Sequence, residues 1–105
     1  MSKNQLNIEE LFSLIKEKIA AKENNSYTNK LAQSGLELIA RKVGEEAVEV
    51  VVAAFAHEKN PCEKTRQELV GEVCDLYYHS LVLLASQGIE LEEISKEFAK
   101  RNQKQ

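Results

Sequence analysis

The chain has 105 residues, 43% of them hydrophobic and 30% charged, and a formal net charge of -3 at pH 7. This length and composition are typical of one globular domain, which we assign to residues 1–105, and they argue against intrinsic disorder. The acidic balance excludes a generally basic nucleic-acid-binding protein, and the longest apolar run, residues 50–56, is too short to span a bilayer, so we expect neither a nucleic-acid nor a membrane partner.

The two cysteines and the N-terminal residues indicate a cytoplasmic protein. Cys62 and Cys74 form no CxxC pair and no larger framework, as expected for reduced thiols. Glu9 and Glu10 occupy the place where a secretory signal would have its apolar segment, so no export signal is visible.

The first third of the chain predicts a helix and a shorter helical segment. Apolar residues recur at helical spacing from about residue 8 to about residue 22, and Asn7 is placed to cap this helix. After a polar break at residues 24–26, a short helix is expected to follow Thr28 and to stop at Gly35, which suits the left-handed position at a helix end.

Two long helices and a shorter one follow. The first long helix is predicted from about residue 36 to about residue 57. The second begins at Pro61 behind an Asn60 cap and ends near residue 87. A final helix, about residues 91–101, has its apolar residues on one face. We therefore expect an all-α bundle of four to five helices, dominated by two antiparallel long helices.

Carboxylates interrupt the apolar faces of both long helices. Glu46 stands in a ridge of apolar residues on the first, and Glu49 lies three residues further. Glu72 interrupts the corresponding ridge on the second, and Asp75 again lies three residues further. Because residues three apart project to the same side of a helix, antiparallel packing would make the two acid pairs face each other.

Four carboxylates at one interface repel one another, and two arrangements relieve that repulsion. Either some acids stay protonated with raised pKa values, or a divalent cation is bound. An all-oxygen donor set suits Mg²⁺, or Mn²⁺, better than zinc. The chain lacks the Glu-x-x-His pairs of di-iron bundles, since Asp75 follows Glu72 at that spacing. The alternative is that these acids form an ordinary solvated helix face.

The acidic pattern resembles that of a known superfamily. Residues 45–49 (EEAVE) and 72–75 (EVCD) are similar to the EExxE…ExxD motif of MazG-like all-α nucleotide pyrophosphohydrolases. Three blocks, residues 26–31 (SYTNKL), 42–50 (KVGEEAVEV) and 75–79 (DLYYH), resemble those of the phosphoribosyl-ATP pyrophosphatases of histidine biosynthesis. The resemblance covers about residues 8 to 101.

This resemblance implies Mg²⁺-dependent hydrolysis of phosphoribosyl-ATP to phosphoribosyl-AMP and pyrophosphate. It also implies a MazG-like fold whose core helices pair in a homodimer or a higher homo-oligomer. By position, the implied metal ligands are Glu46, Glu49, Glu72 and Asp75. Glu45 would be a further ligand, a group supporting the ligands or a base that orients the attacking water. Glu45 and Glu46 are together the implied catalytic residues.

Candidate substrate contacts follow from the residues near these acids. Lys42 and Lys30 could meet phosphate oxygens as point charges, or could be ordinary solvated lysines. His79, one turn after Asp75, could orient that carboxylate, contact substrate or serve as a buried, hydrogen-bonded structural residue.

The block at residues 26–31 adds three more candidates. Ser26 and Thr28 could bind the ribose phosphate, although helix capping would also explain Thr28. Tyr27 could stack on adenine or simply pack, whereas packing is favoured for Tyr78.

Two other functions compete with this hypothesis. A related hydrolase could act on free nucleoside triphosphates such as dUTP or dCTP, since no spacing in the chain identifies a phosphoribosyl group. A non-enzymatic helical oligomerisation module would have the same amphipathic helices and show no response to Mg²⁺.

Overall fold

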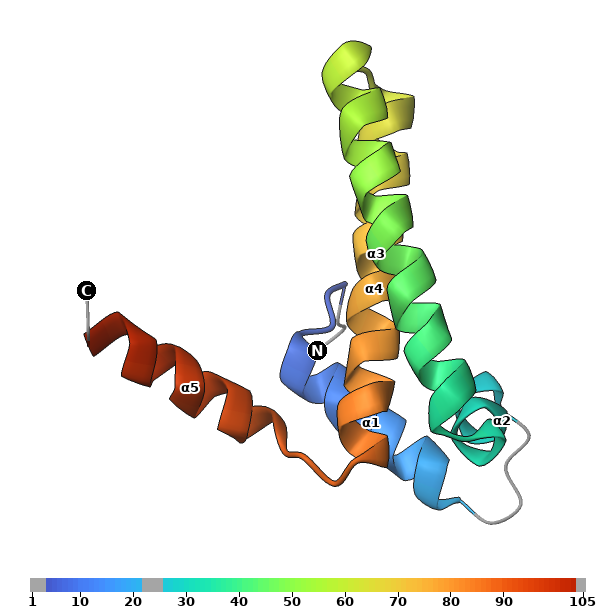
Figure 1. Ribbon diagram of the computed structural model, residues 1–105, viewed down its shortest axis with the longest axis vertical. Coiled ribbons are helices and arrows are strands. Elements are labelled where there is room, and N and C mark those ends of the chain that lie inside the picture. The colour runs from blue at the N-terminus through green and yellow to red at the C-terminus, as the bar shows by residue number, and fades with distance from the viewer. Residues whose placement is uncertain (1–3, 22–25, 104–105) are drawn as a thin grey trace.

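The computed structural model describes residues 4–21 and 26–103, and the only regular secondary structure in this part of the chain is helical, with no strand (Figure 1). Its five helices are α1 (Ile8–Ala20), α2 (Tyr27–Ser34), α3 (Leu36–Lys59), α4 (Glu63–Ser86) and α5 (Leu91–Gln103). The predicted all-α fold is confirmed.

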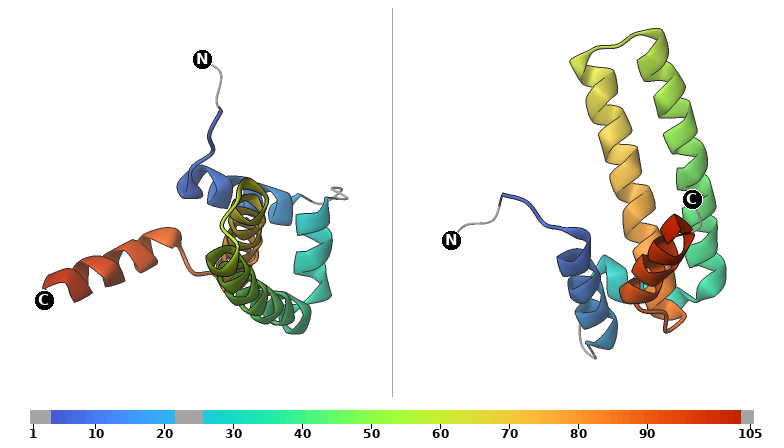
Figure 2. Two further views of the ribbon diagram at one scale, coloured as in Figure 1. Left: turned by 90° about the horizontal axis from the view of Figure 1, so that it is seen from above. Right: turned by 90° about the vertical axis from the view of Figure 1, so that its left-hand side faces the viewer.

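The long helices α3 and α4 run antiparallel and form a hairpin that dominates the molecule (Figures 1 and 2). α1 and α2 pack against one end of this hairpin, which we call its base and which holds the start of α3 and the end of α4. The other end, where α3 turns into α4, stands clear of α1 and α2. None of the described helices has an apolar stretch sufficient to cross a membrane.

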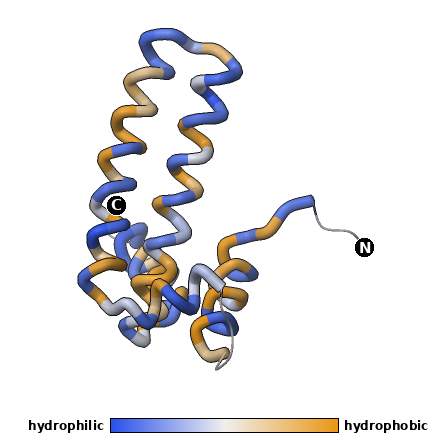
Figure 3. Tube along the Cα trace, turned by 90° about the vertical axis from the view of Figure 1, so that its right-hand side faces the viewer, coloured by the Kyte–Doolittle hydropathy of each residue, from blue (hydrophilic) through white to orange (hydrophobic). Residues whose placement is uncertain are grey.

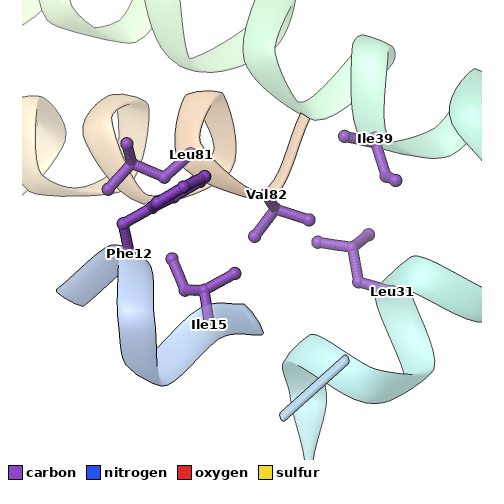
Figure 4. Packing of buried hydrophobic residues seen from close by; sticks show 6 residues of the cluster. All are labelled: Phe12, Ile15, Leu31, Ile39, Leu81 and Val82. Carbon is purple, nitrogen blue, oxygen red and sulfur yellow. The ribbon is translucent and has the colours of Figure 1, made fainter. Parts of the chain in front are cut away.

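The hydrophobic core lies at the base of the hairpin (Figure 4). Four helices each contribute to it, because each has an apolar stripe at helical spacing. Its buried members are Phe12, Ile15, Leu31, Ile39, Leu81 and Val82. Beyond the base, apolar residues continue along both arms of the hairpin (Figure 3). Several of these are exposed, among them Val48, Val51, Val52, Phe55 and Val70.

The helix ends agree with the sequence prediction in some places and correct it in others. Asn7 caps α1 in a capping box with Glu10, and Gly35 ends α2 with a φ of 96° that favours glycine. The capping role considered for Thr28 is wrong, since the Ser26 side chain accepts the Asn29 backbone N–H and Thr28 lies inside α2.

The start of α4 also differs from the prediction. The helix begins at Glu63 with Cys62 as its N-cap, so the cap at Asn60 and a first turn at Pro61 are wrong. The cause is Thr65, whose hydroxyl oxygen accepts the Cys62 backbone N–H at 3.1 Å and lies 3.1 Å from the carbonyl oxygen of Asn60.

The last helix, α5, extends away from the bundle (Figure 2). It has no buried residue, and the Phe98 side chain on its apolar face is 67% exposed. An ion pair between Lys16 Nζ and Glu90 Oε1, 2.8 Å apart, connects the segment before α5 to α1. The helix exists as predicted, but its apolar face is not covered by the rest of the described chain.

Candidate functional site

The two predicted acid pairs face each other across the α3–α4 hairpin. Glu46 and Glu49 lie on α3, and Glu72 and Asp75 lie on α4. The negative charges of the other three acids all act on the carboxylate of Glu72 and raise its pKa. Antiparallel packing thus brings together the four residues whose spacing predicted a shared site.

Glu72 is subject to repulsion from the other three acids. Burial is the largest cause of its raised pKa, followed by a hydrogen bond that its protonated form can give to Glu49 and by the negative charges of Glu49, Asp75 and Glu46. Its Oε1 atom is buried and has no hydrogen-bond partner in the described structure. A buried carboxylate oxygen without a donor is costly, so this position calls for a proton or a cation.

The donor chemistry of the cluster fits a hard divalent cation, because all four groups are carboxylates. Their surroundings differ, since Glu46 is 9% exposed whereas Glu49 and Asp75 are exposed. Among the described residues, no three His, Cys, Asp or Glu side chains lie close enough to enclose a metal ion. A cation held here would therefore complete its coordination with water or with substrate oxygens, as Mg²⁺ usually does.

His79 is buried and hydrogen-bonded, as one of the predicted alternatives has it. Its Nδ1 lies 2.5 Å from Oε1 of Glu46 and 3.1 Å from the backbone carbonyl oxygen of Asp75. Its Nε2 lies 2.8 Å from the hydroxyl oxygen of Tyr27. The carboxylate that His79 contacts is thus Glu46, on the facing helix, whereas its contact with Asp75 is to the backbone.

Three aromatic rings pack together beside this contact. The rings of Tyr27 and Tyr78 are stacked with centroids 6.3 Å apart, and both meet the His79 imidazole edge to face. Tyr78 is half-buried against the core, which agrees with its predicted packing role, and burial together with Tyr27 raises the pKa of its hydroxyl. Tyr27 is 53% exposed and so keeps part of its ring open to solvent.

The remaining predicted site residues are distributed over α2 and α3. Lys42 is half-buried on α3, one turn before Glu46, and Glu45 is exposed beside Glu46. On α2, Lys30 is exposed, whereas Thr28 is only 1% exposed and its hydroxyl has no partner in the described structure. Their roles toward substrate stay predictions.

Asn29 is a structural residue that the sequence did not reveal. It is 3% exposed, and its amide nitrogen lies 3.0 Å from the Lys18 carbonyl oxygen and 2.9 Å from that of Ala21. The carbonyl oxygens at the end of α1 have no partner within that helix, so Asn29 supplies their donor and ties α1 to α2. Such a contact depends on how two helices meet, and no local pattern announces it.

Two hollows in the described part of the chain lie away from the four acids of the α3–α4 cluster. One of about 550 Å³ lies between α1 and α5 and includes Phe12, Lys16 and Lys96. The other, of about 320 Å³, is lined by Ile8, Tyr77, Ser80, Leu81 and Phe98. Both exist because α5 stands away from the bundle, and neither contains a residue of the acid cluster.

Comparison with known proteins identifies the family. Residues 8–102 match the family described as phosphoribosyl-ATP pyrophosphohydrolase. A protein of Lactiplantibacillus plantarum is 47% identical over 93% of this chain and 86% of its own length, and one of Metallosphaera sedula is 45% identical over 90% and 94%. A protein of Clostridium acetobutylicum is 38% identical over 99% of this chain and 87% of its own length. All three are named phosphoribosyl-ATP pyrophosphatase, and with a match over nearly its whole length this chain belongs to the phosphoribosyl-ATP pyrophosphohydrolase family.

Proposed function

We propose that this protein hydrolyses phosphoribosyl-ATP to phosphoribosyl-AMP and pyrophosphate in histidine biosynthesis, with Mg²⁺ as its cofactor and Mn²⁺ as a possible substitute. Family membership supports the reaction and the substrate. The observation that supports the cofactor is Glu72, a carboxylate with a buried, unpartnered oxygen among three like charges.

The charge of the substrate explains why the acids require a cation. A polyphosphate is strongly anionic, so the carboxylates of Glu46, Glu49, Glu72 and Asp75 would repel it. Ligands drawn from these four residues would hold the cation together with water and phosphate oxygens, and the bound cation would neutralise phosphate charge and lower the pKa of a coordinated water.

Basic and acidic residues around the cluster have complementary roles in this proposal. Lys42, one turn before Glu46, and Lys30, exposed on α2, would contact phosphate oxygens. Glu45 precedes Glu46 in the chain and is exposed, and we propose that it accepts a proton from the attacking water. Positioning and charge stabilisation of this kind provide most of the acceleration in phosphoryl transfer.

We also propose that the protein is a homodimer. On the part of α3 beyond the base, Val48 and Val52 are each 62% exposed and Phe55 is 71% exposed. Large apolar side chains gathered on one arm mark an association surface, and a second copy would cover them. Light scattering should give the mass of a dimer, and Val52→Glu should shift it toward the monomer; a monomeric wild type would contradict the proposal.

The reaction is tested by measuring pyrophosphate release from phosphoribosyl-ATP, dUTP and dCTP at saturating Mg²⁺. Phosphoribosyl-ATP should be strongly preferred. Glu46→Gln and Asp75→Asn should abolish release while helical content by circular dichroism stays near wild type. Glu92→Gln removes the same charge from exposed α5 and should change nothing.

Three results would overturn the proposal. Preference for a free nucleoside triphosphate would refute the substrate. Near-normal turnover in Glu46→Gln and Asp75→Asn would refute the ligand assignment. Absence of any Mg²⁺-dependent activity would favour an oligomerisation module instead.

A further inference from the structure

We propose that His79 and Tyr27 are positioning residues, which hold the Glu46 carboxylate in one orientation toward the divalent cation. This inference rests on the proposed function, because it assigns Glu46 to that cation. It is carried by a chain of hydrogen bonds from Tyr27 on α2, through His79 on α4, to Glu46 on α3.

The partners of His79 assign its protons. Nδ1 faces Oε1 of Glu46 at 2.5 Å and the carbonyl oxygen of Asp75 at 3.1 Å. A carbonyl oxygen can only accept, so Nδ1 carries a hydrogen and donates. In the neutral imidazole Nε2 is then an acceptor, and the Tyr27 hydroxyl, 2.8 Å away, donates to it. Each hydrogen bond in the series from Tyr27 through His79 to Glu46 thus has a donor and an acceptor.

Because His79 and Glu46 are both buried, they contact each other and not solvent. His79 is 6% exposed and Glu46 is 9% exposed, and both ring nitrogens of His79 have partners within the chain. The ring is therefore engaged in holding Glu46 and is not free to bind phosphate. Its bond to Oε1 restrains the carboxylate, and the second oxygen, Oε2, would then act as the metal ligand.

The neighbouring elements restrain the ring of His79 itself. The edges and faces of Tyr27 and Tyr78 pack against it, with centroids 5.8 and 5.4 Å from that of the imidazole. Outer partners that orient a metal-binding side chain typically change metal affinity or activity by about 10–100-fold when removed. We expect an effect of this size from losing the His79 N–H.

The test measures Mg²⁺ binding by calorimetry in the absence of substrate. His79→Ala should weaken binding by about 10–100-fold. His79→Asn keeps an amide N–H near the place of Nδ1 and should restore affinity close to that of the wild type. Tyr27→Phe removes only the hydroxyl and should give a smaller loss in the same direction.

The other histidine of the chain provides a matched control. His57 lies eleven residues after Glu46 on α3, roughly 16 Å along the helix, and contacts Thr65. His57→Ala should bind Mg²⁺ like the wild type. In turnover assays, excess Mg²⁺ should bring the kcat of His79→Ala back toward the wild-type value, because the ligands themselves remain.

The possible outcomes separate this inference from the proposed function. A wild-type protein that binds no Mg²⁺ overturns both. Wild-type affinity in a folded His79→Ala protein overturns the positioning role alone, as does a loss that His79→Asn fails to restore. If His79→Ala does not fold, Tyr27→Phe decides, since unchanged affinity in that variant refutes the proposed chain.

Discussion

Replacing Glu72 by Gln should change the stability of the protein in opposite directions with and without Mg²⁺. The substitution keeps the size of the side chain and removes its charge. Without metal, it relieves the repulsion from Glu49, Asp75 and Glu46 and gives the group an N–H that can donate to Glu49. The metal-free variant should therefore melt at a higher temperature than the metal-free wild type.

The response to Mg²⁺ should be smaller in the variant. A ligand present at 100 times its Kd stabilises the folded state by about 2.7 kcal/mol. An unfolding entropy of about 2 cal/mol/K per residue over 105 residues turns this into a Tm increase of roughly 12 °C for the wild type. If losing one carboxylate ligand weakens binding tenfold, the same Mg²⁺ concentration gives about 1.4 kcal/mol, or roughly 6 °C.

Circular dichroism melts would measure both effects, in chelator and in Mg²⁺, at one fixed protein concentration because association also affects Tm. Glu92→Gln is the control, since it removes an equal charge from exposed α5. An undiminished Mg²⁺ increment in Glu72→Gln would refute the role of Glu72 as a ligand. A lower metal-free Tm would refute the repulsion.

Three further predictions concern the metal-free chain. The pKa of Glu72 is raised by folding, so the folded state holds this proton more tightly than the unfolded state does. The Tm of the wild type, measured relative to that of Glu72→Gln, should therefore be highest below the ordinary pKa near 4.5, fall as the pH rises toward the raised pKa, and stay constant above it. A Tm difference that grows with pH would contradict this sign. Ile39 is 0% exposed, so Ile39→Ala should lower the free energy of unfolding in urea by about 2–5 kcal/mol, whereas a loss below about 1 kcal/mol would contradict the packing. Asn29→Ala should cost about 1–3 kcal/mol and speed hydrogen exchange in α1, because carbonyl oxygens at the end of that helix lose their donor, and unchanged exchange would show that other groups supply it.

Helices and the acid cluster were accessible from the sequence because both depend on local periodicity. The apolar spacing gives α1 its predicted start at Ile8, and the break at Gly35 gives α3 its start at Leu36. The i, i+3 spacing puts each acid pair on one side of its helix, and antiparallel packing of two long helices then leaves little freedom in where the pairs meet.

Contacts between distant residues were not accessible in the same way. His79 and Glu46 are 33 residues apart, and their meeting depends on the rotation of α3 against α4, so the sequence pointed to the nearer Asp75. The sequence prediction misplaced the cap of α4 for a related reason. Thr65 folds back on Cys62 in a turn, and residue propensities do not specify the geometry of that turn. The apolar face of α5 is likewise visible as a sequence pattern. The sequence does not show that this face lacks a partner within the described chain.

The carboxylate side chains of the acid cluster differ in how firmly the fold holds them. Glu46 is anchored near the core by a buried histidine, whereas Glu49 and Asp75 are exposed to solvent, where a side chain loses less rotamer freedom than in the interior. An incoming polyphosphate would thus meet one carboxylate whose orientation is already fixed and others that can adjust to its length. The fixed orientation of Glu46 lowers the entropy that is lost on binding. The exposed acids, Glu49 and Asp75, tolerate variation in the ligand.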